Sequence, residues 1–574
     1  MTTPGDPTGR APSIRESRRD QIFPTLTERQ LAILTAYGER RRYPAGAVVF
    51  EEGQRHIPMF VVLSGALEIV RRTVSGEEVV VTDTAGMFTG EVGQLSGRGA
   101  IAGGRAREDS EVVVIDEAAV RRIVVGEAEL SELIMRAFIL RRVALIEDPA
   151  GGATVVGSRH SNETLLLRHF LTRNAQPHTY LDVDSDAGTA EMLQRFGVDT
   201  EELPVLICSD GRLLRKPSLR QVADCLGLGP ERLDGRTYDV AVVGAGPAGL
   251  ATAVYAASEG LHVLVLDGKA PGGQAGTTSR IENYFGFPTG ISGQALAGRG
   301  FVQAEKFGAE VAIPREGVRM ECAGNGAVAI HIDGGERITA RTVVVATGAR
   351  YRKPALANLE RFEGRGIYYA ASFMEAQLCS QQEVIVVGGG NSAGQAAVFL
   401  APYAKQVHVL VRGAGLAASM SSYLMQRIEG AANITLHTES EIVALEGEQD
   451  LEQVRWRHRP SETMHDCAVR AVFLFLGANP NTAWIDGCLA LDAAGFVKTG
   501  GAISAAELEA AHWPLARPPY PLETSRVGIF AVGDVRSGSV KRVAAAVGEG
   551  SSAVQTIHAV LGESRQRETS PTAV

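Results

Sequence analysis

The sequence lacks several features that would place a chain of 574 residues in a class at once. No apolar run approaches the roughly 18 residues of a membrane-spanning helix, so no membrane association is expected. The polar N-terminus, residues 1–21, has no apolar core of a signal peptide, which indicates a cytoplasmic protein. The formal net charge of −9 provides no surplus of basic groups for phosphate contacts, which argues against a nucleic-acid partner.

The sequence also lacks cysteines that lie close together. No two of the six cysteines form a C-x-x-C pair, so the sequence contains neither a local dithiol nor a zinc knuckle, and no metal site is expected. In a cytoplasmic protein we expect all six to be reduced, mostly buried thiols. They are Cys208, Cys225, Cys322, Cys379, Cys467 and Cys488.

The length predicts about three or four domains, at roughly 100–200 residues each. Two stretches rich in glycine and proline, 147–152 and 227–235, break the chain into three segments. Short strand-like runs with glycine turns fill 22–146 and end in a helix-like stretch at 130–146. Strand and helix patterns alternate in 153–226. The pattern indicates a multidomain α/β protein.

Two glycine-rich fingerprints of dinucleotide-binding folds lie 144 residues apart. The first, GAGPAG at 244–249, follows the apolar run 238–243 and precedes a helix-like stretch at 250–258. Glycines at these positions let the backbone approach a pyrophosphate, whose charge is favoured by the helix N-terminus. Asp267 ends the next apolar run, 261–266, where an acid is expected to bind the adenosine ribose.

The second fingerprint, GGGNSA at 388–393, follows the apolar run 383–387. It is inserted in the first domain, because after about residue 475 the chain returns to a further apolar strand and loop at 528–534. Two nucleotide sites in one module imply electron transfer between two cofactors.

The module at 237–562 resembles the low-molecular-weight thioredoxin reductase family. It carries the family's flavin-contacting GGQ at 272–274, an ENYFGF segment at 282–287, the ATG crossover at 346–348 and the terminal FAVGD at 530–534. The resemblance implies Rossmann-like domains for FAD, over 237–350 and 475–562, and for NAD(P)H, over 351–474. It implies that FAD is bound by Gly244, Gly246, Gly249, Asp267, Gly273, Gln274, Asn283, Gly533 and Asp534, the last on the ribityl chain.

By the same resemblance the nicotinamide donor binds at the second fingerprint. Where the family holds the 2′-phosphate of NADPH with several arginines, this sequence keeps one, Arg412. One guanidinium can still pair with a phosphate. NADPH, NADH and the lack of a productive nicotinamide site all stay open as alternatives. The implied contacts are Gly388, Gly390, Ser392, Ala393 and Arg412.

The family's catalytic segment, Y-C-x-x-C-D, has no functional counterpart. Residues 369–374 read YAASFM, so Ala370 and Phe373 replace the cysteines and Met374 replaces the acid. Dithiol exchange needs an attacking thiolate and a resolving thiol. The ordinary thioredoxin reductase mechanism is therefore excluded here, and the catalytic residues stay unassigned. Cys379 is interpreted as a buried structural thiol.

Residues 153–226 resemble a thioredoxin or glutaredoxin fold, through the strand order and Leu203-Pro204-Val205 at the family's cis-proline position. Ser158-Arg159-His160-Ser161 stands where that family has C-x-x-C, so we expect a spacer or docking module without dithiol chemistry.

Residues 22–146 resemble the β-roll of cyclic-nucleotide-binding domains. Phe88-Thr89-Gly90-Glu91 is similar to the opening of the family's phosphate cassette, with one insertion. The resemblance implies that Gly90 and Glu91 contact the ribose and phosphate region. Position 100, where the family's phosphate-binding arginine is expected, is alanine, so Arg98 is the nearest candidate. The alternative is a dimerisation or interaction domain.

Together these features predict a cytoplasmic, homodimeric, FAD-dependent NAD(P)H oxidoreductase that passes electrons to an external protein or small-molecule acceptor, with regulation by a cyclic nucleotide. Two alternatives stay open. The first is a flavin-binding sensor or interaction protein with little turnover. The second is a disulfide reductase that uses distant cysteines.

Overall fold

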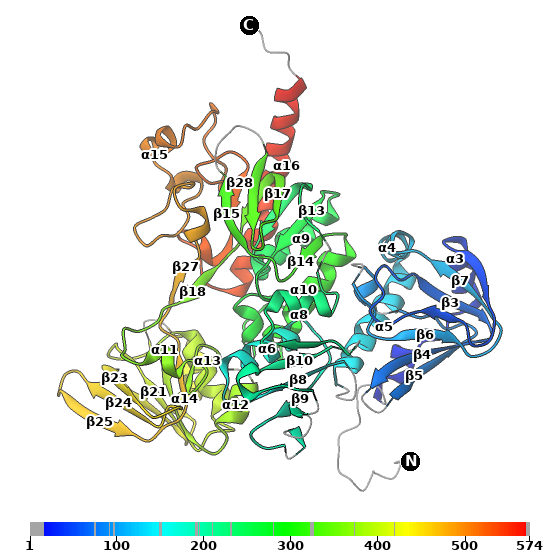
Figure 1. Ribbon diagram of the computed structural model, residues 1–574. Coiled ribbons are helices and arrows are strands. Elements are labelled where there is room, and N and C mark those ends of the chain that lie inside the picture. Colours follow the sequence, from blue (N-terminus) through cyan, green and yellow to red (C-terminus); the bar gives the residue numbers. More distant parts are fainter. Residues whose placement is uncertain are drawn as a thin grey trace. The chain divides into compact units, whose positions relative to one another are not determined.

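The computed structural model of the chain describes residues 17–569, apart from short gaps at 74–75, 91, 96–97, 148–151, 187, 190–192, 195, 209–210, 230–231, 279, 322–326, 372 and 418–419. The chain forms two compact units (Figure 1). One comprises residues 1–158, 167–232 and 302–314, and the other comprises 159–166, 233–301 and 315–574. No helix among the described residues is long and apolar enough to cross a membrane.

The N-terminal segment is a roll of two antiparallel sheets, as the glycine-punctuated strands predicted. The first sheet has the order β1-β7-β3 and the second the order β2-β6-β4-β5. Helix α3 begins with a capping box in which Thr27 and Gln30 satisfy each other's backbone amides. The strands are β1 (Glu39–Tyr43), β2 (Val48–Phe50), β3 (Met59–Ser64), β4 (Ala66–Thr73), β5 (Gly76–Thr84), β6 (Gly103–Ala106) and β7 (Ser110–Ile115), and the helices include α3 (Glu28–Ala36), α4 (Glu117–Gly126) and α5 (Ala128–Glu147).

A four-stranded sheet of order β11-β10-β8-β9 follows, with β8 parallel to β9 and antiparallel to β10. The Leu203–Pro204 peptide bond is cis, as the thioredoxin resemblance implied. Our expectation of six reduced thiols was wrong, because Cys208 and Cys225 form a disulfide and Cys488 is also disulfide-bonded. The elements are β8 (Ala153–Gly157), α6 (Asn162–Arg173), β9 (His178–Asp182), β10 (Val205–Ile207), β11 (Leu213–Arg215) and α8 (Leu219–Cys225).

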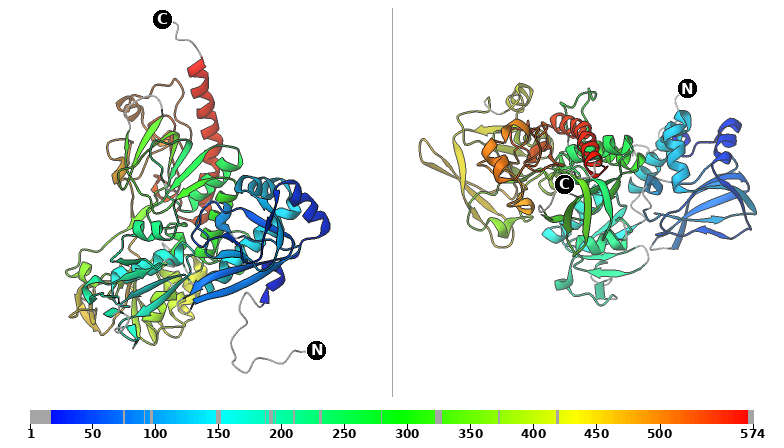
Figure 2. Two further views of the ribbon diagram at one scale, coloured as in Figure 1. Left: turned by 45° about the vertical axis from the view of Figure 1, so that its right-hand side comes forward. Right: turned by 90° about the horizontal axis from the view of Figure 1, so that it is seen from above.

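The first fingerprint belongs to a sheet with the order β13-β12-β17-β16-β15, in which β28 also pairs in parallel with β17. Strand β28 comes from the C-terminal part of the chain, as the interrupted-domain prediction required. Helix α16 (Val543–Thr569) packs on α9 (Pro247–Ser258) (Figure 2). There Thr252 Oγ1 donates to the Gly550 carbonyl at 3.2 Å. The strands are β12 (Thr237–Val243), β13 (Val263–Leu266), β15 (Gly317–Glu321), β16 (Val328–Ile332), β17 (Arg337–Val345) and β28 (Ile529–Ala531).

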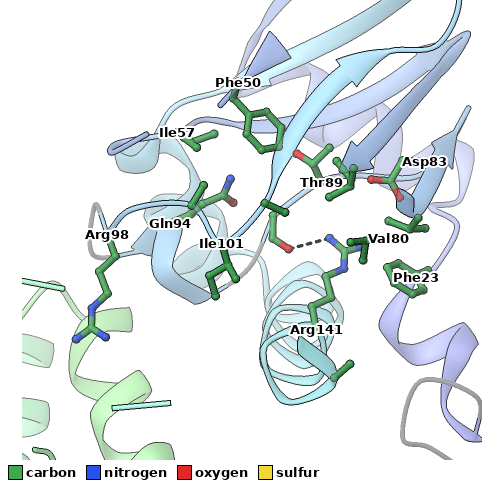
Figure 3. Close-up of a pocket in the computed structure, with 16 residues that line it drawn as sticks. Phe23, Phe50, Ile57, Val80, Asp83, Thr89, Gln94, Arg98, Ile101 and Arg141 are labelled. Atoms are coloured by element: carbon green, nitrogen blue, oxygen red, sulfur yellow. Dashed lines mark hydrogen bonds between the residues drawn. The ribbon is translucent and has the colours of Figure 1, made fainter. Parts of the chain in front are cut away.

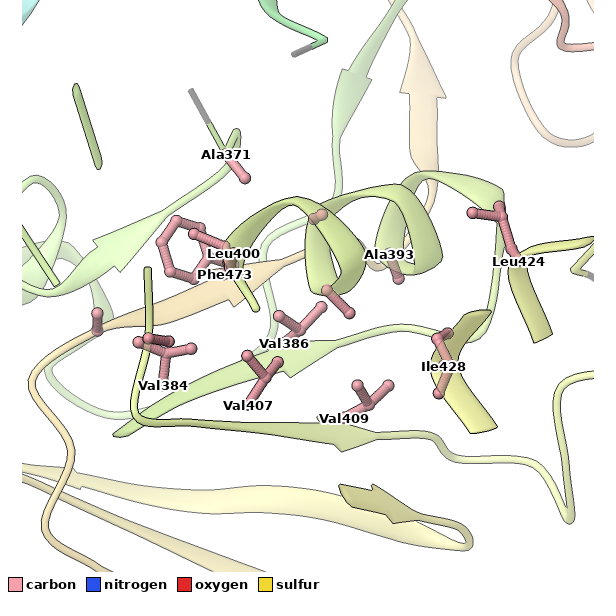
Figure 4. Packing of buried hydrophobic residues seen from close by; sticks show 14 of the residues in the cluster. Ala371, Val384, Val386, Ala393, Leu400, Val407, Val409, Leu424, Ile428 and Phe473 are labelled. Carbon is pink, nitrogen blue, oxygen red and sulfur yellow. The ribbon is translucent and has the colours of Figure 1, made fainter. Parts of the chain in front are cut away.

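The second fingerprint belongs to a parallel sheet of order β19-β26-β20-β21-β22. One face packs against α13 (Asn391–Leu400) and α14 (Ser422–Glu429) through alternate strand residues such as Val384, Val386, Val407 and Val409 (Figure 4). The other face packs against an antiparallel meander, β23-β24-β25. The strands are β19 (Ile367–Tyr368), β20 (Glu383–Val387), β21 (Gln406–Leu410), β22 (Ile434–His437), β23 (Ser440–Glu446), β24 (Gln453–His458), β25 (Thr463–Cys467) and β26 (Val472–Leu474).

A two-stranded ribbon carries the chain between these two nucleotide-type sheets. Strand β18 (Ala349–Tyr351) leaves the first and pairs antiparallel with β27 (Ala478–Pro480), which returns to it. The ribbon lies close to the predicted crossings near residues 350 and 475, although the domain limits themselves stay predictions.

Candidate functional site

The first fingerprint forms a tight turn between β12 and α9. Gly244 has φ +111°, and a Cβ there would overlap the Ala346 carbonyl, while a Cβ at Gly249 would overlap the Gly244 carbonyl. A Cβ at Gly246, the N-cap of α9, would meet no atom within 4 Å. The first and third glycines are therefore required by packing within the chain. The middle one leaves open space at a helix N-terminus, where a pyrophosphate is expected to lie.

Asp267, at the end of β13, organises this turn. Its carboxylate accepts hydrogen bonds from the backbone N–H groups of Ala245 at 2.9 Å, Lys269 at 2.9 Å and Ala270 at 3.1 Å. The structure thus ties the acid to the fingerprint loop. Its predicted contact with the ribose stays a prediction.

Two of the later flavin-type segments lie against the same turn. A Cβ at Gly273 would lie 3.1 Å from Gly246 Cα, and one at Gly533 would lie 3.0 Å from the Ala248 side chain. The Gln274 amide donates to the Ala349 carbonyl at the start of the ribbon. Asn283 lies in the turn that follows Glu282. The structure therefore brings together segments that are up to 289 residues apart in sequence.

Asp534 is half-buried, just after β28. Burial raises the pKa of its carboxyl, and so does nearby Glu549, whereas Lys541 lowers it. The neighbouring Gly533 N–H donates to Glu549 Oε2 at 2.7 Å. An acid at this depth beside the fingerprint fits the ribityl hydroxyls of FAD, which would donate hydrogen bonds to it. The residues present therefore fit the flavin that the family implies.

The second fingerprint repeats the first geometry. Gly388 has φ +141°, and a Cβ there would overlap the Phe475 carbonyl, while Gly390 is the N-cap of α13. Ser392 and Ala393 lie in the first turn of that helix, with Ala393 fully buried. A helix N-terminus at this position favours the charge of a pyrophosphate.

Arg412 lies just beyond β21, exposed to solvent, and the structure adds a second arginine beside it. Arg459 follows β24 and donates from its guanidinium to the Arg412 carbonyl. Glu441 lies near these arginines and accepts a hydrogen bond from Arg457 at 2.6 Å. Arg457, together with Arg459 and Arg412, lowers the pKa of the Glu441 carboxyl. Sequence reasoning missed Arg459 because it lies 47 residues from Arg412 on another strand pair.

Ala370 and Phe373, which stand where the family has its two cysteines, carry neither an acid–base group nor a thiol. Ala370 is half-buried, and Phe373, the first residue of α12 (Phe373–Leu378), is 57 % exposed against Tyr403. Cys379 is buried, its thiol donates to the Glu375 carbonyl at 3.1 Å, and burial raises its pKa to about 11. It is therefore a structural thiol, as expected, and not a nucleophile at neutral pH.

The N-terminal roll encloses a cavity of about 90 Å³, lined largely by apolar side chains (Figure 3). Three polar side chains in its wall each keep an atom without a hydrogen-bond partner in the part of the chain that the structure describes. These atoms are Asp83 Oδ1, Gln94 Oε1 and Arg141 Nη2. Arg141 is fixed by bonds from Nε to the Ile22 carbonyl at 2.8 Å and from Nη1 to the Gly90 carbonyl at 2.9 Å. Such atoms are built to receive a polar ligand or water.

The predicted effector contacts are placed unevenly around this cavity. Gly90 lies in its wall with φ +127°, whereas Glu91 lies outside the described residues. Arg98 borders the cavity, but its guanidinium points away from Asp83 and Arg141 (Figure 3) and pairs with Glu305 at 3.5 Å. Sequence reasoning missed Asp83 and Arg141, which lie 58 residues apart on β5 and α5.

Comparison with known proteins agrees with this geometry. Residues 238–550, more than half of the chain, match the family described as pyridine nucleotide-disulphide oxidoreductase, and residues 40–126 match the cyclic nucleotide-binding domain. Thioredoxin reductase of Streptomyces coelicolor is 31 % identical over 340 residues, covering 58 % of this chain and 98 % of that protein. Thioredoxin reductase of Mycolicibacterium smegmatis is 32 % identical over 317 residues, covering 55 % and 94 %.

Solved structures show the same similarity. The crystal structure of thioredoxin reductase from Lactococcus lactis has 27 % identity and a TM-score of 0.51, covering 57 % of this chain and 99 % of that one. The thioredoxin reductase of T. acidophilum has 26 % identity and a TM-score of 0.50, covering 56 % and 98 %. The chain belongs to the pyridine nucleotide-disulphide oxidoreductase family, as a thioredoxin reductase-like, FAD-dependent NAD(P)H oxidoreductase with an N-terminal cyclic nucleotide-binding-type domain.

Proposed function

We propose that this enzyme passes electrons from NAD(P)H, through FAD, to an acceptor outside the chain and without the family's dithiol. The observation that carries the proposal is the pair Ala370 and Phe373 at the position of the dithiol. When bound, the flavin supplies the two-electron relay between the nicotinamide and the acceptor. The chain supplies the two helix N-termini that bind the nucleotides and the half-buried carboxyl of Asp534 that orients one of them.

Anaerobic mixing with NADPH or NADH tests this function. Either donor should bleach the flavin band within seconds, and an acceptor screen of redox proteins, quinones and small disulfides should then restore it. Coupled insulin reduction through thioredoxin at the usual rates of thioredoxin reductases would refute the proposal. A flavin that neither donor reduces would favour a sensor or interaction protein with little turnover.

The disulfide between Cys208 and Cys225 favours one specific alternative, a disulfide reductase that uses distant cysteines. A double variant, Cys208→Ser with Cys225→Ser, distinguishes the two functions. It should leave turnover with the identified acceptor unchanged if the acceptor is reduced directly, and abolish it if this disulfide relays the electrons. Cys379→Ser is the matched control, because that thiol is buried and has no disulfide partner.

We propose NADPH as the donor, with its 2′-phosphate held by Arg412 together with Arg459. Both side chains are exposed: Arg412 lies just past β21, and Arg459 just past β24. The hydrogen bond from the Arg459 guanidinium to the Arg412 carbonyl brings the two residues together. Two guanidinium groups would restore part of the family's missing clamp.

We also propose that the N-terminal domain binds a cyclic nucleotide as an effector, with Gly90, Glu91 and Arg98 as the contacts implied by sequence and Arg141 as an added cation. Calorimetry with cyclic AMP and cyclic GMP should detect binding, which Arg98→Ala and Arg141→Ala should each weaken. A loss in only one variant identifies the arginine that holds the phosphate. No binding of either nucleotide at millimolar concentration would leave this domain an assembly role.

A further inference from the structure

A cluster of metal-ligating side chains lies between the five-stranded nicotinamide-type sheet and its meander. Glu383 opens β20, His408 lies within β21, and Cys467 ends β25. Because side chains alternate along a strand, Val384, Val386, Val407 and Val409 face the helices, and Glu383 and His408 face the meander. The three residues thus come from three strands but gather on one side of the sheet.

The distances suit a metal ion. One ligand atom from each of Glu383, His408 and Cys467 lies within 4.8 Å of the other two. His408 Nε2 is 3.5 Å from Glu383 Oε2. Tetrahedral zinc, with bonds of about 2.0–2.3 Å to nitrogen, oxygen and sulfur, holds its ligand atoms roughly 3.3–3.8 Å apart. Movements of about 1 Å, well within the freedom of half-buried side chains, would close the cluster around such an ion.

His437 gives His408 the support that metal-bound histidines need. His437 Nε2 lies 3.1 Å from His408 Nδ1, and its ring packs on Trp456 at a centroid distance of 4.6 Å. A partner at Nδ1 fixes the ring orientation. It leaves Nε2 on the side of Glu383, where this nitrogen can coordinate an ion once it gives up its proton. A histidine held in this way is prepared for coordination.

The charges around the cluster also fit a divalent cation. Lys405 Nζ binds Glu383 Oε1 at 3.1 Å, so Oε2 is the oxygen on the side of His408. Cys467 is not in a disulfide. One thiolate and one carboxylate would neutralise a doubly charged ion, with the thiol proton released on binding. Mixed nitrogen, oxygen and sulfur ligands select zinc over magnesium or calcium.

We propose that Glu383, His408 and Cys467 bind one zinc ion, with a water molecule as fourth ligand and His437 as the residue that positions His408. The ion would fasten the meander to the nicotinamide-type sheet by joining β25 to β20 and β21. This site is independent of the proposed electron acceptor and of the effector domain.

The test uses the full-length flavoprotein, stripped with a chelator, reloaded with zinc and dialysed. Elemental analysis should find one zinc per chain. Zinc X-ray absorption should show one sulfur at about 2.3 Å among nitrogen and oxygen ligands at about 2.0–2.2 Å. Cys467→Ser should remove the sulfur shell and weaken zinc affinity at least about tenfold, and His437→Gln should weaken it by about 10–100-fold while keeping the sulfur shell.

Cys379→Ser is the matched control and should bind zinc as the wild type does, because that buried thiol lies on the opposite side of the sheet, in the helix-facing core. If Cys467→Ser fails to fold, protection of Cys467 from alkylation by zinc in the wild type decides the question. Zinc absent after dialysis, bound without sulfur, or bound without protecting Cys467 would overturn the proposal. The cluster would then be only a set of hydrogen-bonded side chains.

Discussion

Replacing the buried Asp83 should change how the stability of the N-terminal roll depends on pH. The Asp83 carboxyl is 1 % exposed, and burial raises its pKa from 3.8 to about 6, although Arg141 acts in the opposite direction. The folded roll therefore keeps this proton up to about pH 6, while the unfolded chain releases it near pH 4. Between these pH values the unfolded state binds fewer protons than the folded state. The contribution of protonated Asp83 to the free energy of unfolding is therefore complete below about pH 4 and is lost as the pH rises through 6.

The interval from 3.8 to about 6 corresponds to about 3 kcal/mol, at about 1.36 kcal/mol for each pH unit. Asp83→Asn cannot titrate and should lack this loss. The free energy of unfolding of the variant, minus that of the wild type, should therefore rise by about 3 kcal/mol from pH 4 to pH 7, whatever its value at pH 4. The ratio of hydrogen-exchange protection in the variant to that in the wild type should rise by a factor on the order of 100 from pH 4 to pH 7.

Hydrogen-exchange mass spectrometry of peptides from β3 and β4 measures this change within the roll alone, which avoids treating a multidomain chain as two-state. Comparing the two proteins at each pH cancels the intrinsic pH dependence of exchange. Arg141→Met should move the loss to higher pH, because it removes the charge that lowers the Asp83 pKa. A protection ratio that stays constant from pH 4 to pH 7 would refute the argument.

Three further outcomes are expected. Gly249→Ala should lower the free energy of unfolding by about 3 kcal/mol or more, because the new Cβ would overlap the Gly244 carbonyl. Gly246→Ala should fold normally but bind FAD more weakly in a fluorescence titration, and unchanged FAD affinity in this variant would place the pyrophosphate elsewhere. Arg459→Gln and Arg412→Gln should each raise KM for NADPH about tenfold and leave KM for NADH unchanged. The control variant Arg455→Gln, on the same hairpin as Arg459, should change neither KM. Equal effects on KM for both donors would exclude a 2′-phosphate contact. Thiol titration of the denatured, unreduced protein should find fewer than six free thiols, and finding all six would contradict the Cys208–Cys225 bond.

Features that depend on backbone conformation could be predicted from the sequence. Gly244 and Gly388, the first glycines of the two fingerprints, have φ of +111° and +141°, a backbone conformation that favours glycine. The apolar runs before them form the strands β12 and β20. The inserted domain followed from the late strand at 528–534, which pairs as β28.

Features formed by distant side chains could not be predicted in this way. Arg459 reaches Arg412 through the packing of a meander. The charge of Arg141 acts on Asp83 only because β5 and α5 border one cavity. The Cys208–Cys225 bond joins the segment after a strand to the end of a helix, with no C-x-x-C spacing to indicate it. Such pairs depend on tertiary contacts, which local spacing does not encode.

The ribbon of β18 and β27 has a mechanical consequence. Both connections of the nicotinamide-type domain run through one antiparallel pair, with Ala349 opposite Pro480 and Tyr351 opposite Ala478. Two separate tethers would resist rotation from opposite sides, but two strands bonded to each other act as a single pivot. The inserted domain can therefore turn as one body about this pivot, with the change in backbone torsion confined to the few residues at either end of the ribbon.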